Sequence, residues 1–98
     1  MRIIKESTLA GWAVSYPQAG MWRKAMRQEQ FEHFADLRRY YRSADQVRVG
    51  SGKTAVVFNI CGNTYRLICA IHYNTGRVFL LRFLTHAEYD KDRWKDEL

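Results

Sequence analysis

Residues 85–91, THAEYDK, bring a histidine, a tyrosine and a lysine close together in the chain. Histidine titrates near neutral pH and can accept or donate a proton, and arginine stabilises the charge that builds on a phosphate during transfer. With Arg66 and Arg82 upstream, these residue types suit cleavage of RNA in which the ribose 2′-hydroxyl attacks the adjacent phosphate and leaves a 2′,3′-cyclic phosphate. A structural interpretation of the same segment is a strand-to-helix junction, with Thr85 as the cap and Glu88 at the capping-box position. The two interpretations are compatible.

Three segments rich in β-branched and aromatic residues must position these groups: 54–61, 64–73 and 77–84. Gly62-Asn63 between the first two is typical of a two-residue hairpin loop, and residues 74–76 form a slightly longer turn. The sequence therefore predicts a three-stranded antiparallel meander in the second half of the chain.

The turns also predict a register. A two-residue loop places Asn59 opposite Arg66, and a turn centred on Thr75 places Ile68 opposite Arg82. Because side chains alternate along a strand, one face is expected to be a core for helices to cover. Its members are Phe58, Ile60, Tyr65, Leu67, Cys69, Ile71, Phe79, Leu81 and Phe83. The other face is expected to carry Val57, Asn59, Arg66, Ile68, Ala70, His72, Leu80, Arg82, Leu84 and His86.

On that second face Arg66 and Arg82 become diagonal neighbours, about 7–8 Å apart at the backbone. Both guanidinium groups could then reach one phosphate; two solvated surface arginines are the alternative. His72 lies roughly 20 Å along the strand from Arg66, so we expect it to be peripheral, and we expect His33 to be a packing or surface residue.

The first half of the chain has helical periodicity. We expect helices over residues 8–16 and 18–34, the second with Met21, Trp22, Ala25 and Met26 on its apolar stripe, and a short helix from about residue 34 to 41. Residues 1–5 are expected to form a short strand, 42–53 a loop, and 90–98 a short C-terminal helix that docks through Trp94. Helices on one face of an antiparallel sheet make the fold class α+β.

Composition limits the function classes. The chain has 98 residues, which predicts one domain over 1–98, and a formal net charge of +6. Residues 1–87 hold 13 Lys or Arg and 5 Asp or Glu, a net charge of +8, which favours a polyanionic partner. There is no apolar run long enough for a membrane span and no signal-peptide block, so we expect a cytoplasmic protein. Cys61 and Cys69 have no metal-ligand spacing, and we expect neither a metal nor a cofactor.

The run VFNICGNTYRLICAIHYNTGRVFLLRFLTHAEYDK, residues 57–91, resembles the HigB toxins of type II toxin–antitoxin systems. The shared features are a strand running into NICGN, then YRL, a hairpin, and RFLTHAEYDK, with Tyr16-Pro17 at the end of an early helix. The resemblance implies a RelE-like α+β fold and a toxin that cuts mRNA, often at the ribosome. It also implies a cognate HigA-type antitoxin, a helix-turn-helix protein.

The resemblance places the family's active site on Arg66, Arg82, His86, Tyr89 and Lys91. The roles it implies are His86 as general acid or base, the arginines on the phosphate, Tyr89 on the substrate and Lys91 as added charge. The expected RNA contacts are Asn59, Asn63, Arg66 and Arg82.

Other functions remain open from the sequence. The same scaffold could serve a toxin that acts on a protein such as gyrase, or a non-catalytic module that binds RNA or the ribosome. An antitoxin or repressor is a third reading, which the absence of a helix-turn-helix pattern and the β-rich second half disfavour.

Overall fold

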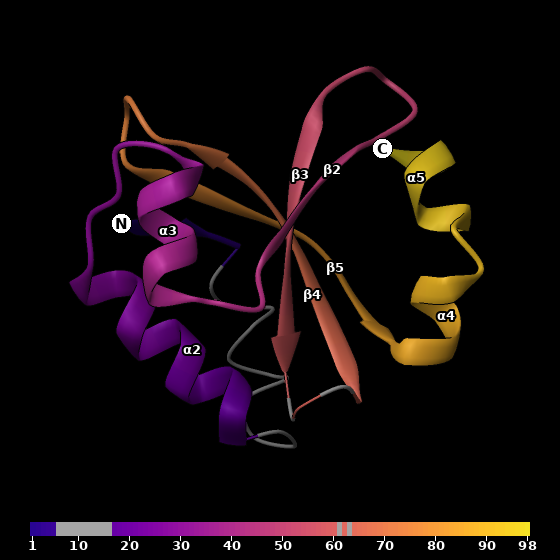
Figure 1. Ribbon diagram of the computed structural model, residues 1–98, viewed down its shortest axis with the longest axis horizontal. Coiled ribbons are helices and arrows are strands. Elements are labelled where there is room, and N and C mark those ends of the chain that lie inside the picture. The colour runs from indigo at the N-terminus through magenta and orange to yellow at the C-terminus, as the bar shows by residue number, and fades with distance from the viewer. Residues whose placement is uncertain (6–16, 61, 63) are drawn as a thin grey trace.

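The computed structural model describes residues 1–5, 17–60, 62 and 64–98 (Figure 1). Within these residues, five strands form one sheet in the order β1-β5-β4-β3-β2. The strands are β1 (Arg2–Ile4), β2 (Asp45–Arg48), β3 (Thr54–Ile60), β4 (Tyr65–His72) and β5 (Arg77–Thr85). The helices are α2 (Pro17–Gln28), α3 (Phe34–Tyr40), α4 (His86–Asp90) and α5 (Arg93–Glu97).

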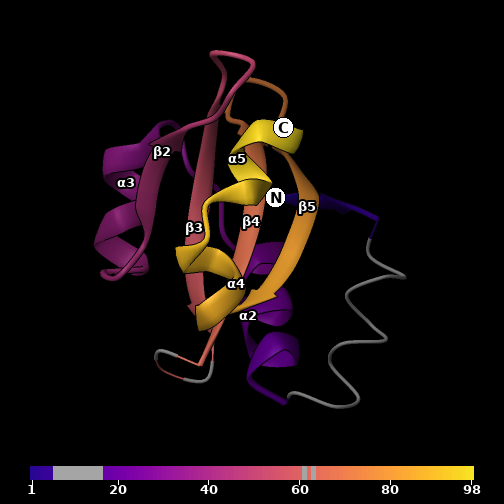
Figure 2. The ribbon, with the colours of Figure 1, turned by 90° about the vertical axis from the view of Figure 1, so that its right-hand side faces the viewer.

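The sheet lies between two helical layers, with α2 and α3 on one face and α4 and α5 on the other (Figures 1 and 2). The α+β class and the meander β3-β4-β5 are confirmed. The meander gains a strand at each edge. β1, the expected opening strand, pairs parallel with β5.

At the other edge, residues 42–53 were expected to be a loop, and this is wrong because β2 pairs antiparallel with β3. The segment DQVR has one β-branched residue and too little alternation to indicate a strand. Its pairing with the strongly β-forming β3 creates the strand. The helix expected over residues 8–16 lies outside the described residues.

The register of β3 and β4 is as predicted, with Asn59 opposite Arg66. That of β4 and β5 is as predicted from Tyr65 to Ile68, which pairs with Arg82. It then shifts, because Cys69 pairs with Leu80 and Leu81 is left as the extra residue of a β-bulge. A bulge reverses the alternation beyond it. The predicted placement of Phe79 and Leu81 on the helix face, and of Leu80 on the other, is therefore wrong.

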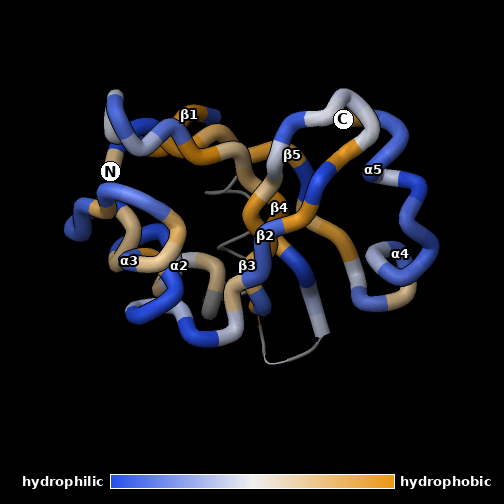
Figure 3. Tube along the Cα trace, turned by 45° about the horizontal axis from the view of Figure 1, so that its top comes forward, coloured by the Kyte–Doolittle hydropathy of each residue, from blue (hydrophilic) through white to orange (hydrophobic). Residues whose placement is uncertain are grey.

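The larger core lies between the sheet and α2–α3. Its centre joins Trp22 and Met26 of α2 and Leu37 of α3 to Phe58 and Leu67 of the sheet. The rings of Trp22 and Phe58 meet edge to face at 5.2 Å. Apolar residues concentrate along the central strands, and polar residues are frequent on the outer helices (Figure 3).

Two details of α2 differ from expectation. The helix ends at Gln28 instead of continuing to Phe34, and the Met1 amine donates to the Met26 and Glu29 carbonyls at that end. Met21 is 70% exposed and does not belong to the apolar stripe.

The second face of the sheet was expected to be open, and instead it carries a smaller core under α4 and α5. Val57 of β3 and Ile68 of β4 are buried there with Trp94 of α5. Trp94 docks as predicted: α5 lies within the C-terminal helix expected over residues 90–98, and α4 is the helix expected after the Thr85 cap. The α4–α5 layer carries His86 and Tyr89 and lies against Arg66 and Arg82, which were predicted as site residues.

Candidate functional site

A capping box fixes the junction between β5 and α4. Thr85 Oγ1 accepts a hydrogen bond from the Glu88 backbone N–H at 3.2 Å, and Glu88 Oε1 accepts one from the Thr85 N–H at 3.1 Å. The backbone N–H of His86 donates to the Thr64 carbonyl at 3.0 Å, at the start of β4. His86 was expected to continue the strand, and it is instead the first residue of α4. The predicted cap is confirmed, and it fixes the backbone position from which the His86 side chain extends.

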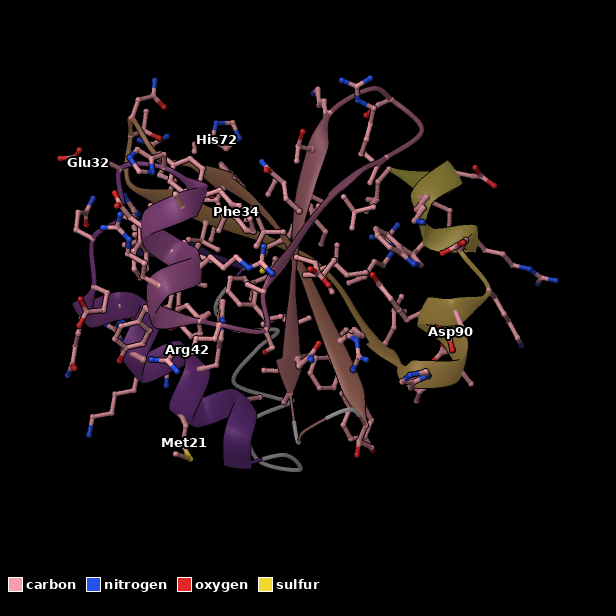
Figure 4. The ribbon with its side chains drawn as sticks, in the orientation of Figure 1. Met21, Glu32, Phe34, Arg42, His72 and Asp90 are labelled. Atoms are coloured by element: carbon pink, nitrogen blue, oxygen red, sulfur yellow. The ribbon has the colours of Figure 1, made fainter. Side chains whose placement is uncertain are left out.

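The His86 imidazole is oriented by a carboxylate one helical turn later. Its Nδ1 lies 2.9 Å from Asp90 Oδ2, and both side chains are at least half exposed. Because Nδ1 faces the carboxylate, Nε2 is the ring nitrogen left to face a substrate. Asp90 was not among the predicted site residues, although the spacing of four residues on a helix could have indicated it. Figure 4 shows Asp90 on the side of the sheet opposite Phe34 and Arg42.

Arg66 is buried, 9% exposed, although an exposed position was expected. Its guanidinium donates to the Tyr65 carbonyl at 3.2 Å and lies 5.5 Å from the centre of the Tyr89 ring. Tyr89 in turn stacks on Trp94, with ring centres 5.4 Å apart, and its carbonyl accepts the Trp94 indole N–H at 3.1 Å. Arg66 therefore supports the ring of Tyr89 from the sheet side.

The Tyr89 hydroxyl stays protonated at neutral pH. Burial, the largest cause, raises its pKa above the usual value, and the nearby cations Lys95 and Arg66 oppose that shift only in part. A protonated phenol can donate a hydrogen bond to a phosphate oxygen.

Arg82 and Lys91 line one pocket of about 310 Å³ between β5 and the α4–α5 layer. The other lining residues are Leu84, Glu88, Arg93, Trp94 and Glu97. The Arg82 guanidinium donates to the Leu81 carbonyl at 2.7 Å and to Glu97 Oε2 at 3.3 Å. Arg93 and Glu97 were not among the predicted site residues. Both belong to the polar C-terminal tail, which in the sequence resembles any solvated helix.

The remaining predicted residues are placed as follows. Asn59 is half-buried on β3 opposite Arg66, and Asn63 lies outside the described residues. His33 and His72 are exposed. His33 lies near Asp36, and His72 is far from α4 (Figure 4). Their peripheral positions are confirmed.

The structure thus brings the candidate residues together in pairs around α4: Arg66 with Tyr89, Arg82 with Lys91, and His86 with Asp90. A larger hollow of about 520 Å³ lies along α2 and is lined by Gly20, Arg23, Lys24, Arg27 and Gln28. Among the described residues that line it, there are cations but no carboxylate or imidazole for proton transfer.

A family model of HigB toxins, the RelE-like toxic component of a toxin–antitoxin system, matches residues 17–92. The chain belongs to this family. The protein is therefore a RelE-like toxin with an antitoxin as its partner, and the family resemblance is confirmed. The match runs from the start of α2 to just beyond α4, so it includes Asp90 but neither Arg93 nor Glu97. No curated protein matches the chain.

The arrangement gives this HigB-family toxin an oriented histidine and a cation-lined pocket, both carried by β5 and the α4–α5 layer. The described residues contain no cluster of three His, Cys, Asp or Glu side chains suited to a metal ion. None of the helices described is long and apolar enough to cross a membrane.

Proposed function

We propose that the toxin is a metal-independent endoribonuclease that cuts mRNA, at the ribosome, and so inhibits translation and growth. The observation that supports this proposal is the His86–Asp90 pair on the short helix whose C-cap, Lys91, lines the pocket of Arg82. An acid–base group and phosphate-binding cations are the parts that cleavage by an internal 2′-hydroxyl requires.

In the proposed reaction, the 2′-oxygen forms a bond to phosphorus as its proton leaves, and the bond from phosphorus to the 5′-oxygen breaks. The products are a 2′,3′-cyclic phosphate and a 5′-hydroxyl. His86 exchanges a proton through Nε2, as general base or as general acid to the leaving oxygen. Arg82 and Lys91 stabilise the charge on the phosphate oxygens in the transition state.

Tyr89 contacts the substrate, and its protonated hydroxyl donates to a phosphate oxygen. Arg66, which is buried beneath that ring, contributes its positive charge from the sheet side and holds Tyr89 in place. Asn59, near the end of β3, and Asn63 supply polar contacts to the RNA. The antitoxin in this proposal is a HigA-type helix-turn-helix protein.

The test is induction of the toxin in cells that lack the antitoxin, followed by mapping of mRNA 5′ ends. Wild type should create new ends, and His86→Ala should remove them, since general acid–base groups contribute about 10²- to 10⁴-fold. His72→Ala is the matched control, because it removes an exposed histidine far from α4 and should cut like wild type.

The other functions give different results in the same experiment. Growth arrest without new 5′ ends would indicate a toxin that acts on a protein target. No arrest and no new ends would favour a non-catalytic RNA- or ribosome-binding module. With purified toxin and ribosomes programmed with one mRNA, a single 2′-deoxy substitution at the cut site should abolish cleavage, because it removes the attacking group.

A further inference from the structure

The C-terminal helix α5 places the Glu97 carboxylate beside the Arg82 guanidinium in the pocket between β5 and the α4–α5 layer. Glu97 Oε2 lies 3.3 Å from the terminal guanidinium nitrogen of Arg82, and both residues line the pocket with Lys91 and Arg93. Glu88 also lines it, but the Glu88 carboxylate is already bound to Thr85 in the capping box. Glu97 is thus the carboxylate that engages Arg82 directly.

Other contacts hold α5 on the sheet without Glu97. Trp94 is 3% exposed and donates its indole N–H to the Tyr89 carbonyl. The Gly50 N–H, in the turn between β2 and β3, donates to the Lys95 carbonyl at 2.7 Å. The Glu97 side chain is 60% exposed, so it can leave Arg82 while the helix remains docked.

A carboxylate and a phosphate compete for the same donors. Arginine binds both through paired N–H groups, and it binds them in similar geometry. The ion pair between Arg82 and Glu97 is partly exposed, at 38% and 60%, and exposed pairs of this kind contribute little stability. An incoming phosphodiester that also meets Lys91 and Arg93 can therefore displace Glu97.

We infer that this pocket binds a phosphodiester group of the RNA substrate through Arg82, Lys91 and Arg93, and that Glu97 is an internal competitor for Arg82. The inference rests on the proposed function for the identity of the ligand as RNA. It adds Arg93 to the binding residues and assigns the C-terminal helix a role in setting affinity for RNA.

The test measures binding of a fluorescent, fully 2′-O-methylated single-stranded RNA, which cannot be cleaved by attack of a 2′-hydroxyl. Glu97→Gln should bind about two- to five-fold more tightly than wild type, the range expected when an exposed ion pair is removed. Asp96→Asn is the matched control. It makes the same charge change one residue away, at an exposed position that does not line the pocket.

Arg82→Gln should weaken binding, and in that background Glu97→Gln should have no further effect, because the group for which Glu97 competes is gone. Arg93→Gln should also weaken binding. Far-UV circular dichroism and urea unfolding of each variant check that it is folded.

Equal binding by Glu97→Gln and Asp96→Asn would overturn the inference, and so would failure of wild type to bind the oligonucleotide. Because the probe is not cleaved, these results are separate from the proposed activity. If cleavage is intact and Glu97→Gln behaves like Asp96→Asn, the competitor role fails while the nuclease stands. If the binding differences appear without any cleavage, the nuclease fails while the pocket and its competitor stand.

Discussion

Replacement of Trp94 by alanine should release the α5 helix from the sheet. The Trp94 side chain is 3% exposed and packs with Val57 and Ile68 in the smaller core. A buried tryptophan removes about 150–250 Å² from water, and at about 25 cal/mol per Å² this stabilises the fold by about 4–6 kcal/mol. The indole hydrogen bond to the Tyr89 carbonyl contributes about 1 kcal/mol more.

The measured loss will be smaller than that sum. α5 has five residues, too few to be stable as an isolated helix, so the variant can undock α5 instead of keeping a large cavity. The cost is then the free energy of docking α5, which includes the Tyr89 stack and the hydrogen bond from Gly50 to Lys95. We expect Trp94→Ala to lower the free energy of unfolding by about 3 kcal/mol, at the low end of tryptophan-to-alanine changes.

Urea unfolding and amide hydrogen exchange measure the two parts of this prediction. The Gly50 amide, which donates to the Lys95 carbonyl, should exchange much faster in Trp94→Ala, while amides of β4 lose protection only with the global loss. Trp94→Phe keeps an aromatic ring in the site and loses the indole N–H, so it should cost about 1–2 kcal/mol. A Trp94→Ala variant within about 0.5 kcal/mol of wild type, with the Gly50 amide still protected, would refute the account of this layer.

Three further changes probe single features, each by urea unfolding. Thr85→Ala removes the capping box and should cost about 1 kcal/mol; no change would mean that the cap does not hold the start of α4. Tyr41→Phe removes a buried hydroxyl with no hydrogen-bond partner among the described residues and should raise the free energy of unfolding at pH 7 by about 1 kcal/mol. Burial raises the pKa of Tyr41, so its phenol ionises more readily in the unfolded chain than in the folded one. The free energy of unfolding should therefore fall as pH rises above about 10, where unfolded tyrosine ionises. Tyr41→Phe should reduce that alkaline loss. Gly76→Ala and Gly52→Ala should destabilise by similar amounts, since both glycines have positive φ and the Gln30 amide, which a Cβ at Gly76 would meet at 2.7 Å, is the end of an exposed side chain that can move aside; a much larger loss at Gly76 would contradict this.

Local signals in the sequence predicted those parts of the fold that depend on local chemistry. The hairpin signal at Gly62-Asn63 determined which residues of β3 and β4 face each other, and the pairing of Asn59 with Arg66 followed. The Thr85–Glu88 pattern predicted a cap that forms as expected. Each of these depends on residues within a few positions of one another.

The features that the sequence could not predict depend on tertiary contacts. Arg66 looks like a surface cation in its strand, and its burial follows from Tyr89 and Trp94 folding back over the sheet. The ion pair between Arg82 and Glu97 joins residues that lie 15 positions apart, and it forms because the C-terminal segment folds back over the sheet in the same way. No local pattern marked Leu81 as the extra residue of a bulge, because a run of apolar residues fits either alternation equally well.

That bulge has a consequence for how β5 can vary in length. Leu81 is the residue of β5 that has no partner between the pairs Ile68–Arg82 and Cys69–Leu80. Loss of Leu81 would leave both of those pairs in place, whereas loss of a neighbouring paired residue would move side chains to new partners. The bulge also places Leu81 and Arg82, two successive residues, on the α4–α5 side of the sheet. Leu81 is thus the position at which this strand can shorten by one residue and still present Arg82 to the pocket, with the loss of the Leu81 packing on the smaller core and a change in the local bend.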